Sequence, residues 1–233
     1  MNNKFWNFTS SGEENVLRID GYIAETSWFE DDVTPKKFKA ELAKISGDLT
    51  IWINSGGGDC FAASQIYTML KEHSGKVTVK IDGIAASAAS VIAMSGAEVL
   101  MSPTSLLMIH NPASMIFGEV ADLEQGIEML SEVKESIINS YELKTGLSRK
   151  ELSKMMDAET WMSAKKAVEL GFADGMLFTE NEVDDCEPVM WNRNSMAIAT
   201  VNAMRKKLPQ KAKTEPTGTP IESLDKRLSL ISH

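Results

Sequence analysis

Two residues that lie far apart in the chain have the chemistry to hydrolyse a peptide bond together. The first, Ser87, lies in a run of small residues, Gly-Ile-Ala-Ala-Ser-Ala-Ala-Ser, that follows the alternating segment 77–81. The alternation predicts a strand and the alanines predict a helix, so Ser87 is expected at a strand-to-helix turn. The first amides of a helix have no partner within it and carry the positive end of its dipole. The Ala88 amide is therefore suited to bind an oxyanion.

His110 is the candidate general base. The chain contains three histidines. His73 lies in a polar segment and His233 is the last residue, whereas His110 follows the apolar run 106–109 and precedes Asn-Pro. A lone histidine at the end of a buried strand is often only a core residue. Beside a serine at a strand-to-helix turn, however, it predicts a nucleophile and its base.

A glycine-rich segment supports this pair. Ser-Gly-Gly-Gly at 55–58 separates a predicted strand, 49–54, from a predicted helix that starts near Cys60 with Asp59 as its N-cap. The segment lacks the Lys-Ser/Thr of a P-loop and the glycine spacing of a dinucleotide site, so nucleotide binding is not expected. We expect it to form a loop that supplies a second oxyanion donor and an edge for an extended peptide.

Four motifs, taken in order, resemble the proteolytic subunit of the Clp protease (ClpP). They are Ile-Asn-Ser-Gly-Gly-Gly, Gly-Ile-Ala-Ala-Ser-Ala-Ala, Met-Ile-His-Asn-Pro and Trp-Met-Ser-Ala-Lys-Lys-Ala-Val-Glu-Leu-Gly-Phe-Ala-Asp, within residues 16–174. Within that family the chain resembles the phage and prophage members, some of which act as head-maturation proteases. The resemblance implies that Ser87 is the nucleophile and His110 the base, and that the amides of Gly57 and Ala88 line the oxyanion hole.

The resemblance leaves two candidates for the third member of a catalytic triad. The family has an aspartate two residues before an aromatic residue, and counting back from Trp161 gives Glu159, with Asp157 two residues earlier. We expect Glu159 to fill this role, because it holds the family's position and its side chain reaches further. Asp157 is the alternative. Ala158 stands where the family often has an arginine that contacts the opposite ring, which predicts weaker assembly.

The remaining patterns predict an α/β fold. Strands and helices alternate with short links from residue 16 to residue 81, which is typical of parallel strands joined by crossovers. Further strands are expected at 98–101 and 106–109. The resemblance implies the ClpP/crotonase-like fold of repeated β-β-α units with a projecting handle helix. The candidate handle is the helical pattern over 119–144, and the alternative is a helix that packs across its own domain.

Composition and charge limit the surroundings in which this chain works. We expect a flexible N-terminus (1–15), a peptidase domain (16–180) and a disordered or weakly helical tail (181–233). The net charge of −9 argues against nucleic acid and anionic membranes as partners. The two cysteines lack metal-ligand spacing, and no signal peptide or membrane-spanning run is apparent. We therefore expect a cytoplasmic protein that needs no metal and no cofactor.

Together these features predict a serine endopeptidase that acts on polypeptides as a homo-oligomeric ring or pair of stacked rings. The expected partner is an AAA+ unfoldase or, in a phage, capsid and scaffold proteins. One alternative is a crotonase-type acyl-CoA enzyme, which shares the fold but does not need a serine–histidine pair. A second alternative is a Ser–Lys peptidase, although such enzymes usually have a membrane segment. A third alternative is a catalytically inactive ring subunit.

Overall fold

The computed structural model describes residues 4–11, 14–24 and 35–178. These residues all belong to one compact unit, Met1–Asp185. The expected C-terminal tail, 181–233, lies outside the described residues. The elements in chain order are β1 (Trp6–Ser11), β2 (Glu14–Ile23), α1 (Pro35–Leu42), β3 (Leu49–Gly58), α2 (Cys60–Lys71), β4 (Val77–Ala86), α3 (Ala88–Ala93), β5 (Glu98–Met101), β6 (Leu106–Ile109), α4 (Val120–Thr145), α5 (Arg149–Asp157), β7 (Thr160–Ser163), α6 (Ala164–Glu169) and β8 (Gly175–Met176).

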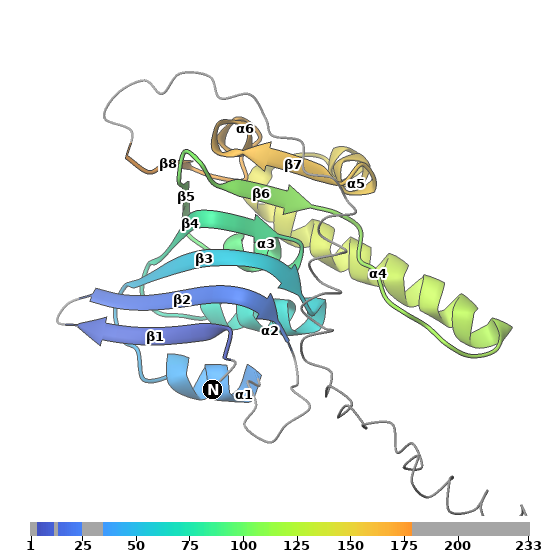
Figure 1. The fold of residues 1–233 in the computed structure, drawn as a ribbon, viewed down its shortest axis with the longest axis horizontal. Helices are drawn as coiled ribbons and strands as arrows, with labels where there is room; N and C mark the ends of the chain where they lie inside the picture. Colours follow the sequence, from blue (N-terminus) through green and yellow to red (C-terminus); the bar gives the residue numbers. More distant parts are fainter. Residues whose placement is uncertain (1–3, 12–13, 25–34, 179–233) are drawn as a thin grey trace, which may run out of the picture. The chain divides into compact units, whose positions relative to one another are not determined.

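The strands form one mixed sheet (Figure 1). Its main order is β1-β2-β3-β4-β5-β8, and β6 pairs with both β4 and β7. The pairings from β2 through β5 to β8 are parallel, as is β4 with β6, whereas β1–β2 and β6–β7 are antiparallel. The α/β class predicted from the alternating strand and helix patterns is therefore confirmed.

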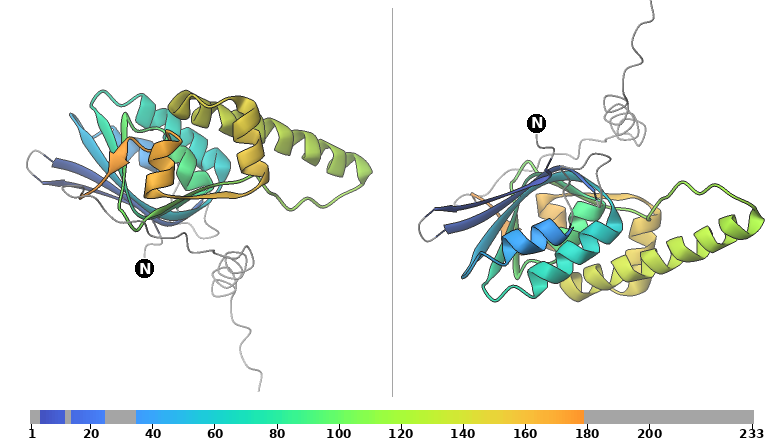
Figure 2. Two further views of the ribbon diagram at one scale, coloured as in Figure 1. Left: turned by 90° about the horizontal axis from the view of Figure 1, so that it is seen from above. Right: turned by 90° about the horizontal axis from the view of Figure 1, so that it is seen from below.

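Helices α1, α2 and α3 cover one face of the sheet (Figures 1 and 2). Alternate residues of the central strands point into this layer, and Ile51 and Ile53 of β3 are fully buried. The matching face of α2 repeats at helical spacing, with Ala62, Ile66 and Leu70 buried. Apolar side chains that repeat every two residues on the strand thus pack against apolar side chains that repeat every 3.6 residues on the helix, and together they form one core.

The N-terminal segment differs from the expected flexible 1–15. Residues 6–11 form β1, which pairs antiparallel with β2. Phe5 and Trp6 are buried, and the Trp6 ring packs edge-on against Phe38 of α1. The Trp6 Nε1 donates a 2.9 Å hydrogen bond to Glu41 Oε2. Burial of these aromatic side chains stabilises β1 as the edge strand, although the surrounding residues are mostly polar.

Two strands run further than the sequence pattern predicts. β3 continues through the glycines to Gly58, so the expected glycine loop is mostly extended strand. β4 continues past Asp82 to Ala86. Its first half pairs with β5 and its last residues, 84–86, pair with β6. The change of partner supplies backbone hydrogen bonds to both halves, so the strand continues beyond residue 81.

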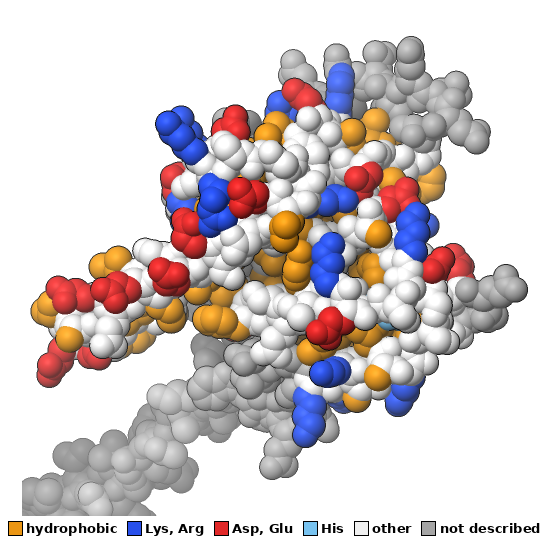
Figure 3. All heavy atoms as spheres, turned by 180° about the vertical axis from the view of Figure 1, so that it is seen from behind, with side chains coloured by type: hydrophobic (Ala, Val, Ile, Leu, Met, Phe, Trp, Pro, Cys, Tyr) orange, Lys and Arg blue, Asp and Glu red, His pale blue; other side chains and the backbone are white. Residues whose placement is uncertain are grey.

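Helix α4 projects beyond the sheet (Figures 1 and 2). Its first half exposes apolar side chains, with Val120 71% and Ile127 66% exposed. Figure 3 shows hydrophobic side chains beside acidic ones on the projecting part. The second half is covered by its own domain, where Ile138 and Tyr141 are buried. The predicted handle and the alternative of a domain-packed helix each describe one half of α4.

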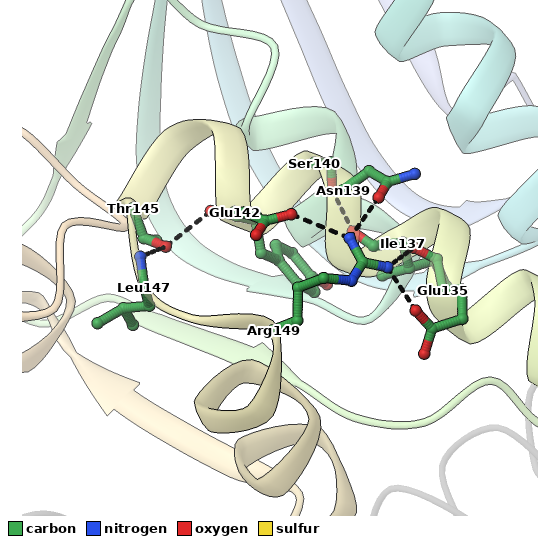
Figure 4. A network of polar contacts seen from close by, with 9 residues as sticks. Glu135, Ile137, Asn139, Ser140, Glu142, Thr145, Leu147 and Arg149 are labelled. Carbon is green, nitrogen blue, oxygen red and sulfur yellow. Dashed lines mark hydrogen bonds and ion pairs between the residues drawn. The ribbon is translucent and has the colours of Figure 1, made fainter.

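Arg149 connects the buried half of α4 to α5 (Figure 4). Gly146 ends α4 in a left-handed conformation, φ 70°, which turns the chain back. Arg149, the first residue of α5, then donates to Asn139 Oδ1 at 2.6 Å and to Glu142 Oε2 at 2.9 Å. It also forms an ion pair with Glu135. These contacts orient α5, whose C-terminal end leads to the candidate site.

Candidate active site

Ser87 occupies a strained turn between β4 and α3. Its φ of 55° and ψ of −126° lie outside the regions that residues other than glycine favour, at a typical cost of about 1–3 kcal/mol. Two groups hold it there. The Ser87 amide donates to the Met108 carbonyl at 3.0 Å, and the Ser87 carbonyl accepts from the Ser90 amide at 2.9 Å. The serine predicted at a strand-to-helix turn is therefore found at one.

His110 lies directly beside this serine. Its Nε2 is 2.8 Å from Ser87 Oγ. The contact follows from sheet pairing, because Ala86 lies opposite Met108 in the parallel β4–β6 pair. The C-terminal ends of the two parallel strands therefore lie side by side. Ser87 directly follows β4, and His110 directly follows β6. In the tautomer that carries its proton on Nδ1, His110 accepts the Ser87 hydroxyl proton at Nε2.

Glu159 lies one step beyond the β6–β7 pair, on the side of His110. That antiparallel pair ends with Ile109 opposite Thr160, and His110 and Glu159 are the chain neighbours of this last residue pair. Glu159 has a positive φ of 50°, which breaks the strand at this point. Trp161 Nε1 donates a long, 3.4 Å hydrogen bond to Glu159 Oε1.

Asp157, the alternative carboxylate, has other partners. Its Oδ1 accepts from Lys134 Nζ at 2.7 Å and from Asn111 Nδ2 at 2.9 Å. The hydrogen bonds from Lys134 and then Asn111 lower the pKa of the Asp157 carboxyl. Its side chain is 56% exposed. Asp157 thus connects α5 with α4 and with the residue after His110.

Gly57 lies against the nucleophile. A Cβ at this position would be 2.7 Å from Ser87 Cβ and 3.0 Å from the Ala88 nitrogen, and its φ is +98°. Only glycine fits so close an approach in that conformation. The Gly57 amide donates to Ser55 Oγ at 3.1 Å, and Ser55 Oγ in turn donates to the Gly21 carbonyl. The sequence placed Gly57 near Ser87 but gave no sign of this buried role for Ser55.

Ser90, the second serine of the motif, is fully buried. Its Oγ donates to the Ser87 carbonyl at 2.6 Å and lies 2.7 Å from Tyr141 Oη. Burial and these two contacts make Ser90 unsuitable as the nucleophile. Tyr141 comes from α4, and nothing in the local sequence pattern connects it with Ser87.

In the described part of the chain, no group of three or more His, Cys, Asp or Glu side chains is arranged to hold a metal ion. Among the described helices, none combines the length and the apolarity that crossing a membrane requires.

Comparison with known proteins identifies the family. The model of the family described as Clp protease matches residues 26–180, which is more than half of the chain. The chain belongs to the Clp protease family. It is similar to the ATP-dependent Clp protease proteolytic subunit 1 of Chlamydia muridarum, with 34% identity over 152 residues that cover 64% of this chain and 79% of that protein.

Two further relatives of the Clp protease family give the same picture. The ATP-dependent Clp protease proteolytic subunit 1 of Chlamydia caviae is 31% identical over 188 residues, covering 74% of this chain and 98% of that protein. The ATP-dependent Clp protease proteolytic subunit of Bacteroides fragilis is 31% identical over 154 residues, covering 63% and 74%. This Clp protease family member is thus a serine-type peptidase, and the crotonase-type alternative is not favoured.

Proposed function

We propose that Ser87, His110 and Glu159 form the catalytic triad of this peptidase. The 2.8 Å contact between His110 Nε2 and Ser87 Oγ carries the proposal. The end of the β6–β7 pair supports Glu159 as the third member, because Glu159 and His110 are the chain neighbours of its last residue pair. Asp157 fits the role less well, since its carboxylate is bonded to Lys134 and Asn111.

The reaction follows from these positions. His110 takes the hydroxyl proton as Ser87 Oγ attacks the peptide carbonyl carbon, and the carbonyl oxygen becomes an oxyanion. His110 then gives the proton to the leaving amine, which departs and leaves an acyl-enzyme. Water repeats the two steps on the ester and frees Ser87. A carboxylate behind His110 holds the tautomer that accepts at Nε2 and stabilises the imidazolium that forms.

The amides of Ala88 and Gly57 hold the oxyanion. Ala88 is the first residue of α3, so its amide has no partner within the helix. Gly57 approaches the same peptide so closely that a Cβ added to it would lie 3.0 Å from the Ala88 nitrogen. Its amide donates to Ser55 Oγ in this structure, so it has to turn towards the oxyanion when substrate is bound. Each such donor contributes roughly 3–4 kcal/mol to lowering the barrier.

A fluorophosphonate probe tests the triad, because it labels only an activated serine. Ser87→Ala should abolish both labelling and peptide hydrolysis in a folded protein. Glu159→Gln should lower kcat far more than Asp157→Asn, the matched carboxylate-to-amide change. If Asp157→Asn is the more damaging of the two, the third role belongs to Asp157.

The active form that we propose is a homo-oligomeric ring, or two stacked rings, in the cytoplasm. The exposed apolar side chains of the α4 handle support it, because large exposed apolar patches mark contact surfaces. Two settings suit such a ring. The names of the relatives, ATP-dependent proteolytic subunits, favour an AAA+ unfoldase partner. The motif resemblance to phage and prophage members favours cleavage of capsid or scaffold proteins during head maturation.

The two settings are separated by what the ring degrades. With an unfoldase partner, a folded protein substrate is degraded only when the unfoldase and ATP are both present. In head maturation, purified capsid or scaffold protein is cut at a few positions without ATP. Mass spectrometry of the products distinguishes short peptides in the first setting from a small number of large fragments in the second.

A further inference from the structure

Two buried hydroxyls form a directed chain behind the nucleophile. Ser90 Oγ lies 2.6 Å from the Ser87 carbonyl oxygen and 2.7 Å from Tyr141 Oη. A carbonyl oxygen only accepts, and a serine hydroxyl has one proton. Ser90 must therefore donate to Ser87, and Tyr141 must donate to Ser90. Burial raises the pKa of Tyr141, so that its proton stays available for this bond.

The acceptor of this chain belongs to the peptide that carries the oxyanion donor. The Ser87 carbonyl and the Ala88 N–H are parts of one planar peptide group and point in opposite directions. Any group that fixes the Ser87 oxygen therefore fixes the direction of the Ala88 N–H. Restraint is needed here, because Ser87 has the strained φ of 55° and ψ sets the orientation of this peptide.

Stability alone gives no reason for these hydroxyls. Ser90 is 0% exposed and Tyr141 is 1% exposed, in surroundings that are mostly apolar. An alanine and a phenylalanine would fill nearly the same space, and replacing both partners of a buried hydrogen bond by apolar groups of the same shape is close to neutral. The Tyr141 ring would still pack against Phe172, since that contact is between rings.

We propose that Ser90 and Tyr141 are positioning residues that hold the Ser87–Ala88 peptide in the orientation that stabilises the oxyanion. Tyr141 lies on α4, so these two hydrogen bonds also connect the handle helix to the nucleophile. The inference rests on the proposed role of the Ala88 amide.

Three variants test it, with hydrolysis of a fluorogenic tripeptide coumarin amide as the assay. Ser90→Ala should lower kcat about 10–100-fold, below the 10²–10³-fold loss typical of a missing oxyanion donor, and change KM less than about twofold. Tyr141→Phe should lower kcat about 3–10-fold, because Ser90 can still donate to Ser87. A peptide boronate, whose tetrahedral adduct occupies the oxyanion site, should lose affinity in parallel with kcat.

The double variant Ser90→Ala with Tyr141→Phe separates positioning from packing. Each single variant leaves one buried hydroxyl without its partner, which should lower the thermal midpoint. The double variant removes both hydroxyls, so its midpoint should be closer to that of the unmodified protein, while its kcat stays as low as in Ser90→Ala. Recovery of kcat together with the midpoint would overturn the inference. Ser140→Ala is the matched control. It deletes a buried α4 hydroxyl that donates to the Ile137 carbonyl, and it should leave kcat unchanged.

Ser87→Ala, assayed alongside, shows which claim has failed. If it keeps the original kcat, the proposed triad is wrong, and this inference fails with it. If Ser87→Ala is inactive and the Ser90–Tyr141 double variant has the original kcat, the triad is retained and only the positioning role is lost.

Discussion

The two halves of α4 have similar amphipathic sequences but different surroundings. In the first half, Val120, Leu123 and Ile127 are 71%, 44% and 66% exposed. In the second half, Ile138 and Tyr141 are buried in the domain core. An apolar stripe thus shows that a helix needs a partner surface, but not whether that surface belongs to its own domain or to another chain. In the proposed ring, the first half packs on a second copy.

The junction between the halves is marked by polar contacts. Lys134 pairs with Asp157 at the end of α5, and Arg149 at the start of α5 pairs with Glu135 and Glu142. Lys134 and Glu135 lie near the middle of α4, and Glu142 lies near its C-terminal end. The second half of α4 therefore serves as a fixed base, from which the first half extends.

The same substitution made in each half should give the largest contrast. Ile138→Ala should lower the free energy of unfolding by about 2–5 kcal/mol, because it leaves a cavity in the core. Ile127→Ala, its counterpart in the first half, should change it by no more than about 0.5 kcal/mol. Urea denaturation of dilute, dissociated protein measures both. Equal losses would show that the first half is also packed within its own chain.

Charges on the first half should affect assembly and leave the fold intact. Leu123→Asp with Ile127→Asp places two carboxylates in the proposed contact surface, where burying them is costly. Particles should become smaller, and peptide hydrolysis should fall about tenfold or more, while circular dichroism stays unchanged. Sedimentation velocity run alongside the hydrolysis assay measures this. The control, Glu124→Gln with Glu128→Gln, keeps the stripe, and a fully active monomer would contradict the ring.

Removing the arginine at the base should have a smaller effect. Arg149→Gln loses the ion pairs to Glu135 and Glu142, both of which are exposed and screened by solvent. We expect a modest fall in thermal midpoint that shrinks as salt is added, because salt already weakens these pairs in the original protein. If the fall in thermal midpoint does not depend on salt, the packing of the Arg149 side chain, and not its charge, is what stabilises the protein.

The junction ion pair should give the smallest effect, visible in its dependence on pH. Lys134 is the main cause of the lowered pKa of Asp157, followed by Asn111. A carboxyl with a lowered pKa stabilises the folded state above its unfolded pKa, about 3.9 for aspartate, and this contribution is lost as the pH falls through the folded pKa. Lys134→Met should therefore be less stable than the original protein near neutral pH. Chemical denaturation should show the difference vanishing in strong acid.

The sequence by itself determined the local elements and the chemistry-bearing residues. Helix 88–93 and strands 98–101 and 106–109 lie where the patterns predicted them, and Ser87 and His110, which were predicted as nucleophile and base, lie 2.8 Å apart. The Asp59 side chain caps α2 by accepting from the Ala62 amide, as expected. These features depend on hydrophobic period and on cap chemistry, which act over a few neighbouring residues.

Only the tertiary structure decided how these elements meet. The β4–β6 pairing brings Ser87 to His110, and the β6–β7 pair ends beside His110 and Glu159. Strand pairing also extended β3 and β4 and ordered β1, against expectation. The Ser90–Tyr141 contact joins residues 51 positions apart. Register and helix docking depend on contacts between distant segments, and a local pattern carries no information about which segment will be the partner.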